Sequence, residues 1–187
     1  MPGDRKTVGA GLHTCLVLFV LGVILAGVTA RTAAYAAGIP QFAAYPASPA
    51  YHGRNAEPKL STPEERTFRP RLREAARERP NFAGRYILTT WGCGTSCVMG
   101  AVIDAQSGRV TFLPATVCCW STSVDDGFRP VEARSTSRLI VLSGLLDEKG
   151  TMGSHFFIFD GHSFTRLTTI EMPDDFGASK RTTPRTP

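Results

Sequence analysis

The stretch RYILTTWGCGTSCVMGAVI, residues 85–103, decides the fold of this chain. Two runs rich in β-branched, aromatic and aliphatic residues, 85–91 and 98–103, flank a short loop with two glycines and two cysteines. Such runs on either side of a glycine-containing loop are typical of an antiparallel hairpin. The loop is the first place to search for a functional site, and its candidate residues are Trp91, Gly92, Cys93, Gly94, Thr95, Ser96 and Cys97.

Further strands are expected downstream of this hairpin. Residues 104–108 form a turn signal, Asp-Ala-Gln-Ser-Gly, between the run 98–103 and an alternating run at 109–113. Three more β-rich runs follow at 139–142, 155–159 and 163–167, and the continuous apolar character of 155–159 indicates burial on both faces.

A helical signal precedes the strands. Thr62 can cap a helix whose third residue is Glu65, a capping-box pattern, and Pro63 suits the first helical position. Pro70 lacks an N–H for the helix ladder, so we expect a kink or a second short helix there, and Pro80 ends the helix. The sequence therefore predicts an α+β fold: an N-terminal helix packed on an antiparallel β-meander of five or six strands, stabilised by disulfides.

The N-terminus resembles an export signal. A weakly cationic start is followed by 13 uncharged apolar residues, 16–28, and by small residues around 30 and 36 that suit signal peptidase. We expect residues 1–36 to be a signal peptide and the protein to be periplasmic or secreted. The alternative is an uncleaved N-terminal anchor, since residues 14–30 could just span a thin bilayer.

The remaining chain divides by composition. Residues 37–60 are rich in Ala, Pro and Gly and follow neither a helical nor a strand period, which predicts a flexible linker. Residues 61–172 are expected to form one α+β domain, and the proline-broken polar stretch 173–187 a disordered tail.

The cysteines are best explained as disulfides in an exported protein. Outside the targeting segment there are four, and these are Cys93, Cys97, Cys118 and Cys119. A bond between the adjacent Cys118 and Cys119 needs a strained ring, so we favour bridges from the two loop cysteines to these two. Such a bridge would close about 20–25 residues and stabilise by about 3 kcal/mol in the chain-entropy model.

Two other uses of the thiols stay open. The spacing is neither paired C-x-x-C, as in zinc sites, nor the usual redox C-x-x-C, but a thiol-dependent redox protein or enzyme using Cys93 or Cys97 remains an alternative. Cys97 with His155 is one conceivable nucleophile pair, although a hydrogen-bonded or solvent-facing histidine is the more ordinary role. A soft-metal site that includes His155 or Met99 is the other alternative.

Charge gives little support to nucleic-acid binding. The chain has 21 Lys and Arg against 16 Asp and Glu, and without residues 1–36 the counts are 18 and 15, a net charge of +3. Its arginines cluster in 66–79 but alternate with glutamates, which is typical of a solvated helix face. We expect no nucleic-acid partner and no cofactor, and membrane contact only through an uncleaved N-terminal segment.

Two motifs, NFAGRY at 81–86 and WGCGTSC at 91–97, resemble a pattern shared by a group of small exported bacterial proteins, NFAGxY … WGCGTxC. The resemblance covers about residues 62–167 and implies an exported bacterial protein, with no catalytic residues to carry over. Together with the export signal and the cysteines, it favours a disulfide-stabilised binding or structural module whose partner is an unidentified protein or envelope component, more than an enzyme.

Overall fold

The structure, a computed structural model, describes residues 38–120 and 127–172. The predicted signal segment and the predicted tail lie outside the described residues. Contacts divide the chain into two units, 1–39 and 40–187, and the description below concerns the second. In the described part of the chain, no helix is long and apolar enough to cross a membrane.

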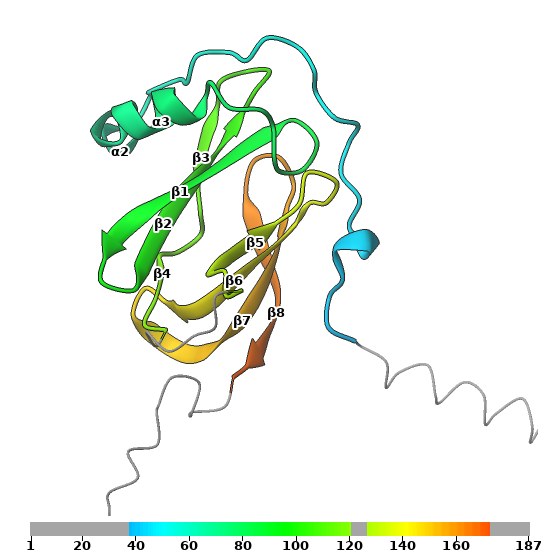
Figure 1. The fold of residues 1–187 in the computed structure, drawn as a ribbon, viewed down its shortest axis with the longest axis vertical. Helices are drawn as coiled ribbons and strands as arrows, with labels where there is room; N and C mark the ends of the chain where they lie inside the picture. The colour runs from blue at the N-terminus through cyan, green and yellow to red at the C-terminus, as the bar shows by residue number, and fades with distance from the viewer. Residues whose placement is uncertain (1–37, 121–126, 173–187) are drawn as a thin grey trace, which may run out of the picture. The chain divides into compact units, whose positions relative to one another are not determined.

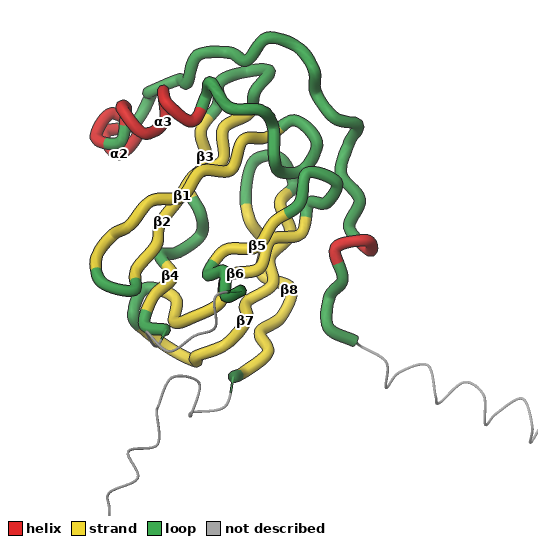
Figure 2. The backbone as a smooth tube through the Cα atoms, viewed as in Figure 1, coloured by secondary structure: helices red, strands yellow, loops and turns green. Residues whose placement is uncertain are grey.

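The second unit is mostly antiparallel β-sheet, with little helix (Figures 1 and 2). Its helical elements are the 3₁₀ turn η1 (Phe42–Ala44), α2 (Pro63–Thr67) and α3 (Arg69–Ala75). Its eight strands are β1 (Tyr86–Gly94), β2 (Cys97–Asp104), β3 (Val110–Phe112), β4 (Val117–Cys118), β5 (Val131–Ala133), β6 (Leu139–Leu146), β7 (Lys149–Phe159) and β8 (Phe164–Glu171).

The strands form one sheet in the order β1-β2-β4-β6-β7-β8. On β2, the end of the strand pairs with β3 and the start pairs with β4. On β6, the first part of the strand pairs with β5 and the last part pairs with β4. The short β4 therefore joins a β1–β3 half to a β5–β8 half. All of these pairings are antiparallel, as the alternating runs and turn signals predict.

Alternation along β6 and β7 places side chains on two buried faces. Ile140 and Phe157 belong to a core cluster that also contains Val102 of β2, whereas Val141 and Phe156 belong to a second cluster with residues near η1. Adjacent residues of a strand point to opposite faces, so Phe156 and Phe157 serve one cluster each. The burial of 155–159 on both faces is confirmed.

The helical segment is shorter than the fold-class prediction implied. Thr62 and Glu65 form the capping box, and a second short helix begins at Arg69, with Pro70 in its first turn. Leu72 of α3 packs in a cluster with Ile87 and Trp91 of β1. The predicted helix is thus replaced by two short helices, α2 and α3, against one face of β1 and β2.

Residues 40–60, here called the strap, do not form the flexible linker that their composition suggested. The strap lies along the sheet unit and its backbone N–H groups donate at four places: Ala47 to Thr136 O at 2.9 Å, Tyr51 to Gly84 O at 3.0 Å, Ala56 to Ala105 O at 2.8 Å, and Lys59 to Gly108 O at 2.8 Å. These bonds satisfy an irregular backbone that has no ladder of its own.

Two glycines make the close approach of the strap possible. A Cβ on Gly84 would lie 2.2 Å from Ser48 O, and one on Gly108 would lie 2.0 Å from Glu57 O. Both glycines also have positive φ, 83° and 74°, which favours glycine over other residues. The physical reason for the wrong linker prediction is therefore tertiary: the docking groups belong to distant turns.

Candidate functional site

The four cysteines form two disulfides at one end of β2, here called the cysteine end. The bonds join Cys93 to Cys97 and Cys118 to Cys119, so the predicted bridges between the loop and the adjacent pair are wrong. Strand pairing shifts between Gly92 and Gly94, which leaves Cys93 as an extra, bulged residue, and Thr95 and Ser96 close a tight turn. The Cα atoms of Cys93 and Cys97 consequently lie 5.1 Å apart, inside the range that disulfides span.

The two disulfides lie on neighbouring strands. Cys97 of β2 is the register partner of Cys118 of β4, and the Cys119 N–H donates to Ser96 O at 2.9 Å. Cys93 and Cys119 are exposed, Cys97 is half-buried and Cys118 is buried. Each bond therefore has a more exposed cysteine, and the two more buried partners face each other across the ladder.

The loop residues predicted as a possible site surround these bonds. Gly92, Gly94 and Thr95 are exposed, whereas Trp91 is buried against Phe68, with their ring centroids 5.0 Å apart. The indole Nε1 of Trp91 is buried without a hydrogen-bond partner. Trp91 thus anchors the hairpin to the helical side, and the exposed part of the loop is its disulfide-closed tip.

His155 does not form a nucleophile pair with Cys97. Its Nε2 lies 3.0 Å from Gly144 O and its Nδ1 lies 2.9 Å from Thr169 Oγ1, while the Cys97 sulfur is bonded to Cys93. Because a carbonyl only accepts, Nε2 carries the proton and Nδ1 accepts from the hydroxyl. Burial lowers the pKa of His155, since the charged imidazolium loses its solvation there.

His155 reaches the cysteine end indirectly, through the backbone of Gly144. A Cβ on Gly144 would lie 2.5 Å from Cys118 O, and its φ of 148° also favours glycine. The Gly144 carbonyl that binds His155 therefore belongs to a segment in close contact with the adjacent cysteine pair.

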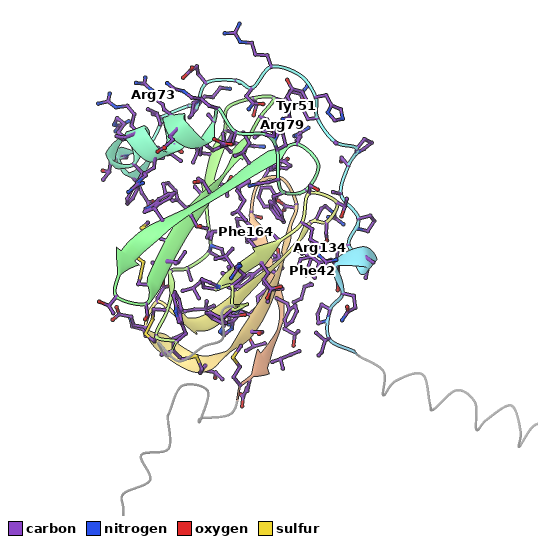
Figure 3. All side chains as sticks on the ribbon, in the orientation of Figure 1. Phe42, Tyr51, Arg73, Arg79, Arg134 and Phe164 are labelled. Carbon is purple, nitrogen blue, oxygen red and sulfur yellow. A yellow bond between two sulfur atoms is a disulfide. The ribbon has the colours of Figure 1, made fainter. Side chains whose placement is uncertain are left out.

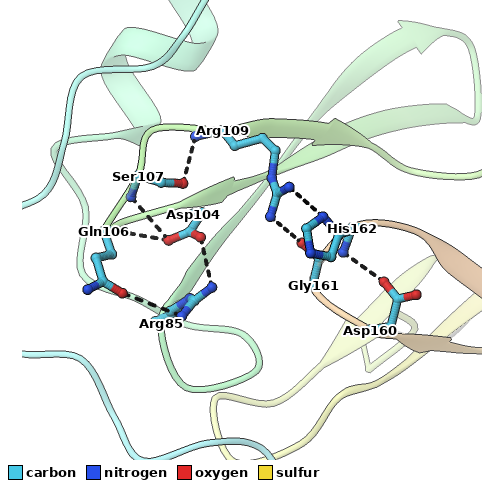
Figure 4. A network of polar contacts seen from close by, with 8 residues as sticks. All are labelled: Arg85, Asp104, Gln106, Ser107, Arg109, Asp160, Gly161 and His162. Carbon is cyan, nitrogen blue, oxygen red and sulfur yellow. Dashed lines mark hydrogen bonds and ion pairs between the residues drawn. The ribbon is translucent and has the colours of Figure 1, made fainter.

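The opposite end of β2 holds a polar network that sequence analysis missed (Figure 4). The buried Asp104 carboxylate pairs with the Arg85 guanidinium at 3.1 Å and accepts from the N–H groups of Gln106 and Ser107 at 2.9 and 3.3 Å. Desolvation lowers the pKa of Arg85, but Tyr86 and the Asp104 carboxylate raise it by more, so the net shift is upward. Asp104 thus fixes both its own turn and the guanidinium of Arg85, the residue that precedes β1.

Arg109 connects this end to the turn between β7 and β8. Its guanidinium donates to Gly161 O at 2.9 Å and contacts Nδ1 of His162 (Figure 4). The turn itself is held by Asp160, whose carboxylate accepts from the His162 and Ser163 N–H groups at 2.7 and 2.8 Å. The hydrogen bond from Ser163, and then that from His162, lowers the pKa of Asp160. These hydrogen bonds hold the turns together, although the Nε of Arg85 is buried without a hydrogen-bond partner among the described residues.

A cavity of about 860 Å³ opens between the strap and the end of α3. Its charged lining is four arginines against two glutamates, namely Arg54, Arg73, Arg77, Arg79, Glu57 and Glu78. Figure 3 places the labelled Arg73, Arg79 and Tyr51 in this region. The wall is fixed by Asn55, whose Nδ2 donates to Ala76 O at 2.9 Å and to Glu78 O at 2.7 Å. The strap thereby caps carbonyls at the end of α3.

None of the arginines in the cavity wall forms an ion pair with another described residue. Within residues 38–120 and 127–172, the ion pair found in the structure joins Arg85 to Asp104. The same residues contain no group of three His, Cys, Asp or Glu side chains that could hold a metal ion. No described cluster therefore supports the metal-binding alternative, whereas the cavity offers guanidinium groups to an anion.

Comparison of the chain with models of protein families, with curated proteins and with solved structures found no match.

Proposed function

We propose that the chain is an exported, disulfide-stabilised binding module that holds an anionic group of an envelope component in the arginine-lined cavity. The observation that carries the proposal is the cavity of about 860 Å³ whose lining has four arginines and two glutamates. A surplus of two positive formal charges favours a carboxylate or a phosphate group as the ligand.

The residue type supports an oxyanion more than a general negative charge. A guanidinium has planar, forked N–H donors that match the oxygen pair of a carboxylate or phosphate. Arg73, Arg77 and Arg79 are exposed at the end of one short helix segment, so their donors face solvent and not a protein carboxylate. A bound anion would gain hydrogen bonds without breaking an ion pair of the described residues.

The opposite wall supports binding with little rearrangement. The strap is held by backbone hydrogen bonds at Tyr51 and Ala56 and by the Asn55 side chain. A preformed wall lowers the ordering cost of binding.

Export is the second part of the proposal. Residues 1–36 have the pattern of a signal peptide, and the two disulfides of the structure suit an oxidising compartment. We infer a periplasmic or secreted protein, with an uncleaved N-terminal anchor as the alternative. Mass spectrometry of the protein from a periplasmic fraction tests this: a mature chain starting near residue 31 or 37 supports export, and an intact chain in the cytoplasm contradicts it.

Anion binding is tested by NMR titration of the arginine Nε–Hε signals with inorganic phosphate. We expect saturable shifts in the natural chain, loss of saturation in the double variant Arg77→Gln/Arg79→Gln, and retention in Arg69→Gln/Arg71→Gln. The second variant is the matched control, because it removes the same charge from α3 outside the cavity lining. Equal loss in both variants would mean non-specific attraction and would overturn the cavity as the site.

The envelope ligand is tested separately by co-sedimentation with purified bacterial envelope fragments. We expect sedimentation of the natural chain, competition by phosphate, and loss in Arg77→Gln/Arg79→Gln. Phosphate binding without sedimentation would keep the anion site but contradict an envelope component as its source.

A further inference from the structure

We propose that the cysteine end is a thiol–disulfide relay, in which reduction of the Cys118–Cys119 bond by a small thiol transfers the remaining disulfide to Cys97–Cys118. The inference is independent of the anion cavity and rests on the register of β2 with β4 and on the exposure of the four cysteines. It assigns the loop an activity toward low-molecular-weight thiols.

The adjacent pair is the bond that opens first. Consecutive Cα atoms are about 3.8 Å apart, closer than the ~4.4–6.8 Å that disulfides usually span. A bond between sequence neighbours therefore closes a strained ring, and Cys119 also has a left-handed φ of 71°. Strained and exposed disulfides are the ones most readily reduced.

Register brings the next two sulfurs together. Cys97 and Cys118 are register partners, and the hydrogen bond from Cys119 N–H to Ser96 O lies on one side of this pair. That pattern makes Cys97 and Cys118 a non-hydrogen-bonded pair, whose Cα atoms are about 4.5 Å apart and whose side chains share a face. A cross-strand disulfide between them fits this spacing.

Exposure sets the direction of the relay. The thiolate of the small thiol attacks Sγ of the exposed Cys119, a mixed disulfide forms, and the Cys118–Cys119 bond breaks with its electron pair on Cys118. The Cys118 thiolate then attacks Sγ of Cys97, so that a Cys97–Cys118 bond forms and the Cys93–Cys97 bond breaks. Cys93 leaves as a thiolate and takes a proton from water.

A second small thiol completes the step. It attacks the mixed disulfide, releases the small-molecule disulfide and leaves Cys119 as a thiol. Two small thiols are thus oxidised to one disulfide, and one protein disulfide is reduced to the thiols of Cys93 and Cys119. The two thiols that result are those of the exposed Cys93 and Cys119, and the remaining bond joins the less exposed Cys97 and Cys118.

Two single variants test the exchange without any reductant. Cys119→Ser leaves Cys118 as a free thiol opposite Cys97, and we expect alkylation followed by non-reducing peptide mapping to find a Cys97–Cys118 bond and alkylated Cys93. Cys118→Ser is the matched control, because its free Cys119 is not the register partner of Cys97; it should retain Cys93–Cys97 with alkylated Cys119. Retention of Cys93–Cys97 in both variants overturns the relay.

The natural chain gives a second test that does not depend on the folding of a variant. The full chain is equilibrated with glutathione and its disulfide in graded ratios, then alkylated and mapped. We expect the species with one remaining disulfide to contain Cys97–Cys118, with Cys93 and Cys119 alkylated. A one-disulfide species that keeps Cys93–Cys97, with Cys118 and Cys119 alkylated, would refute the proposal, as would loss of both bonds in one step.

Discussion

The two ends of β2 are held in place by different chemistry. At its start, Cys97 forms one disulfide and is the register partner of a cysteine of the other, whereas at its end Asp104 forms an ion pair and accepts two backbone hydrogen bonds. The disulfides connect residues close in sequence, but the polar contacts at Asp104 and Arg109 connect the turn before β1, the β2–β3 turn and the β7–β8 turn. The covalent end therefore contributes local rigidity, and the polar end joins distant parts of the sheet.

The short loops that the two disulfides close support this contrast. The loop closed by Cys93 and Cys97 spans five residues, a sequence separation of 4, in place of the predicted bridge over about 20–25 residues. In the chain-entropy model such a short loop is worth about 2 kcal/mol, and the adjacent pair less. Stability should consequently depend more on the polar end than the cysteine count suggests.

The largest effect is expected from Asp104→Ala at the polar end. The change leaves the Gln106 and Ser107 N–H groups without their acceptor and the Arg85 guanidinium without its ion-pair partner. We expect a loss of about 3 kcal/mol in the free energy of unfolding, measured by urea denaturation. Gln106→Ala, in the same turn, is the control and should change the free energy of unfolding by less than about 1 kcal/mol. Similar losses for both would contradict the central role of Asp104.

The second effect is at the cysteine end. The double variant Cys93→Ser/Cys97→Ser should lower the free energy of unfolding by about 2 kcal/mol, because the unfolded chain regains the freedom of the five-residue loop. Cys118→Ser/Cys119→Ser should cost less, since its ring constrains only neighbouring residues. Urea denaturation of the two variants side by side tests the order, and a larger loss for the adjacent pair would reverse it.

The sequence predicted the hairpins well because local signals fix them. The runs at 85–91 and 98–103 became β1 and β2, and the turn 104–108 joins β2 to β3. The short strands β4 and β5 were missed, since two or three residues give no period and their pairing is supplied by β2 and β6. The sequence therefore predicts a strand correctly where the run of β-forming residues and the turn signal next to it are local.

The site residues were predicted only in part, for a related reason. The four cysteines could be named, but their pairing depends on the bulge at Cys93, which no composition signal marks. Asp104 was visible as a turn residue, yet its contact with Arg85 follows from the register of Tyr86 with Asp104. The arginine cavity depends on where the strap docks, and that is decided by two distant glycine turns.

A third, smaller effect is expected from Arg109→Gln. The change removes the hydrogen bond to Gly161 O and the contact with His162, so the β2–β3 turn loses its link to the β7–β8 turn. We expect a loss of about 1 kcal/mol, with Lys59→Gln as a control from the same surface region. Hydrogen exchange of the His162 and Ser163 N–H groups should also become faster in Arg109→Gln alone. Unchanged exchange there would mean that Asp160 holds the turn without help.

The smallest effect is a pH dependence at the covalent end, through His155. Its folded-state pKa lies below the ordinary ~6.5 because burial disfavours the imidazolium. Between these two pKa values the unfolded chain binds more protons than the folded one, so stability is fully present above ~6.5 and falls as the pH drops toward the folded-state pKa. Urea midpoints from pH 7.5 to 5 should show this slope in the natural chain and a flatter one in His155→Gln, which keeps a polar side chain without the titration. If His155→Gln keeps the natural slope, the titration of His155 does not set that slope, and the Gly144 contact does not couple the cysteine end to pH.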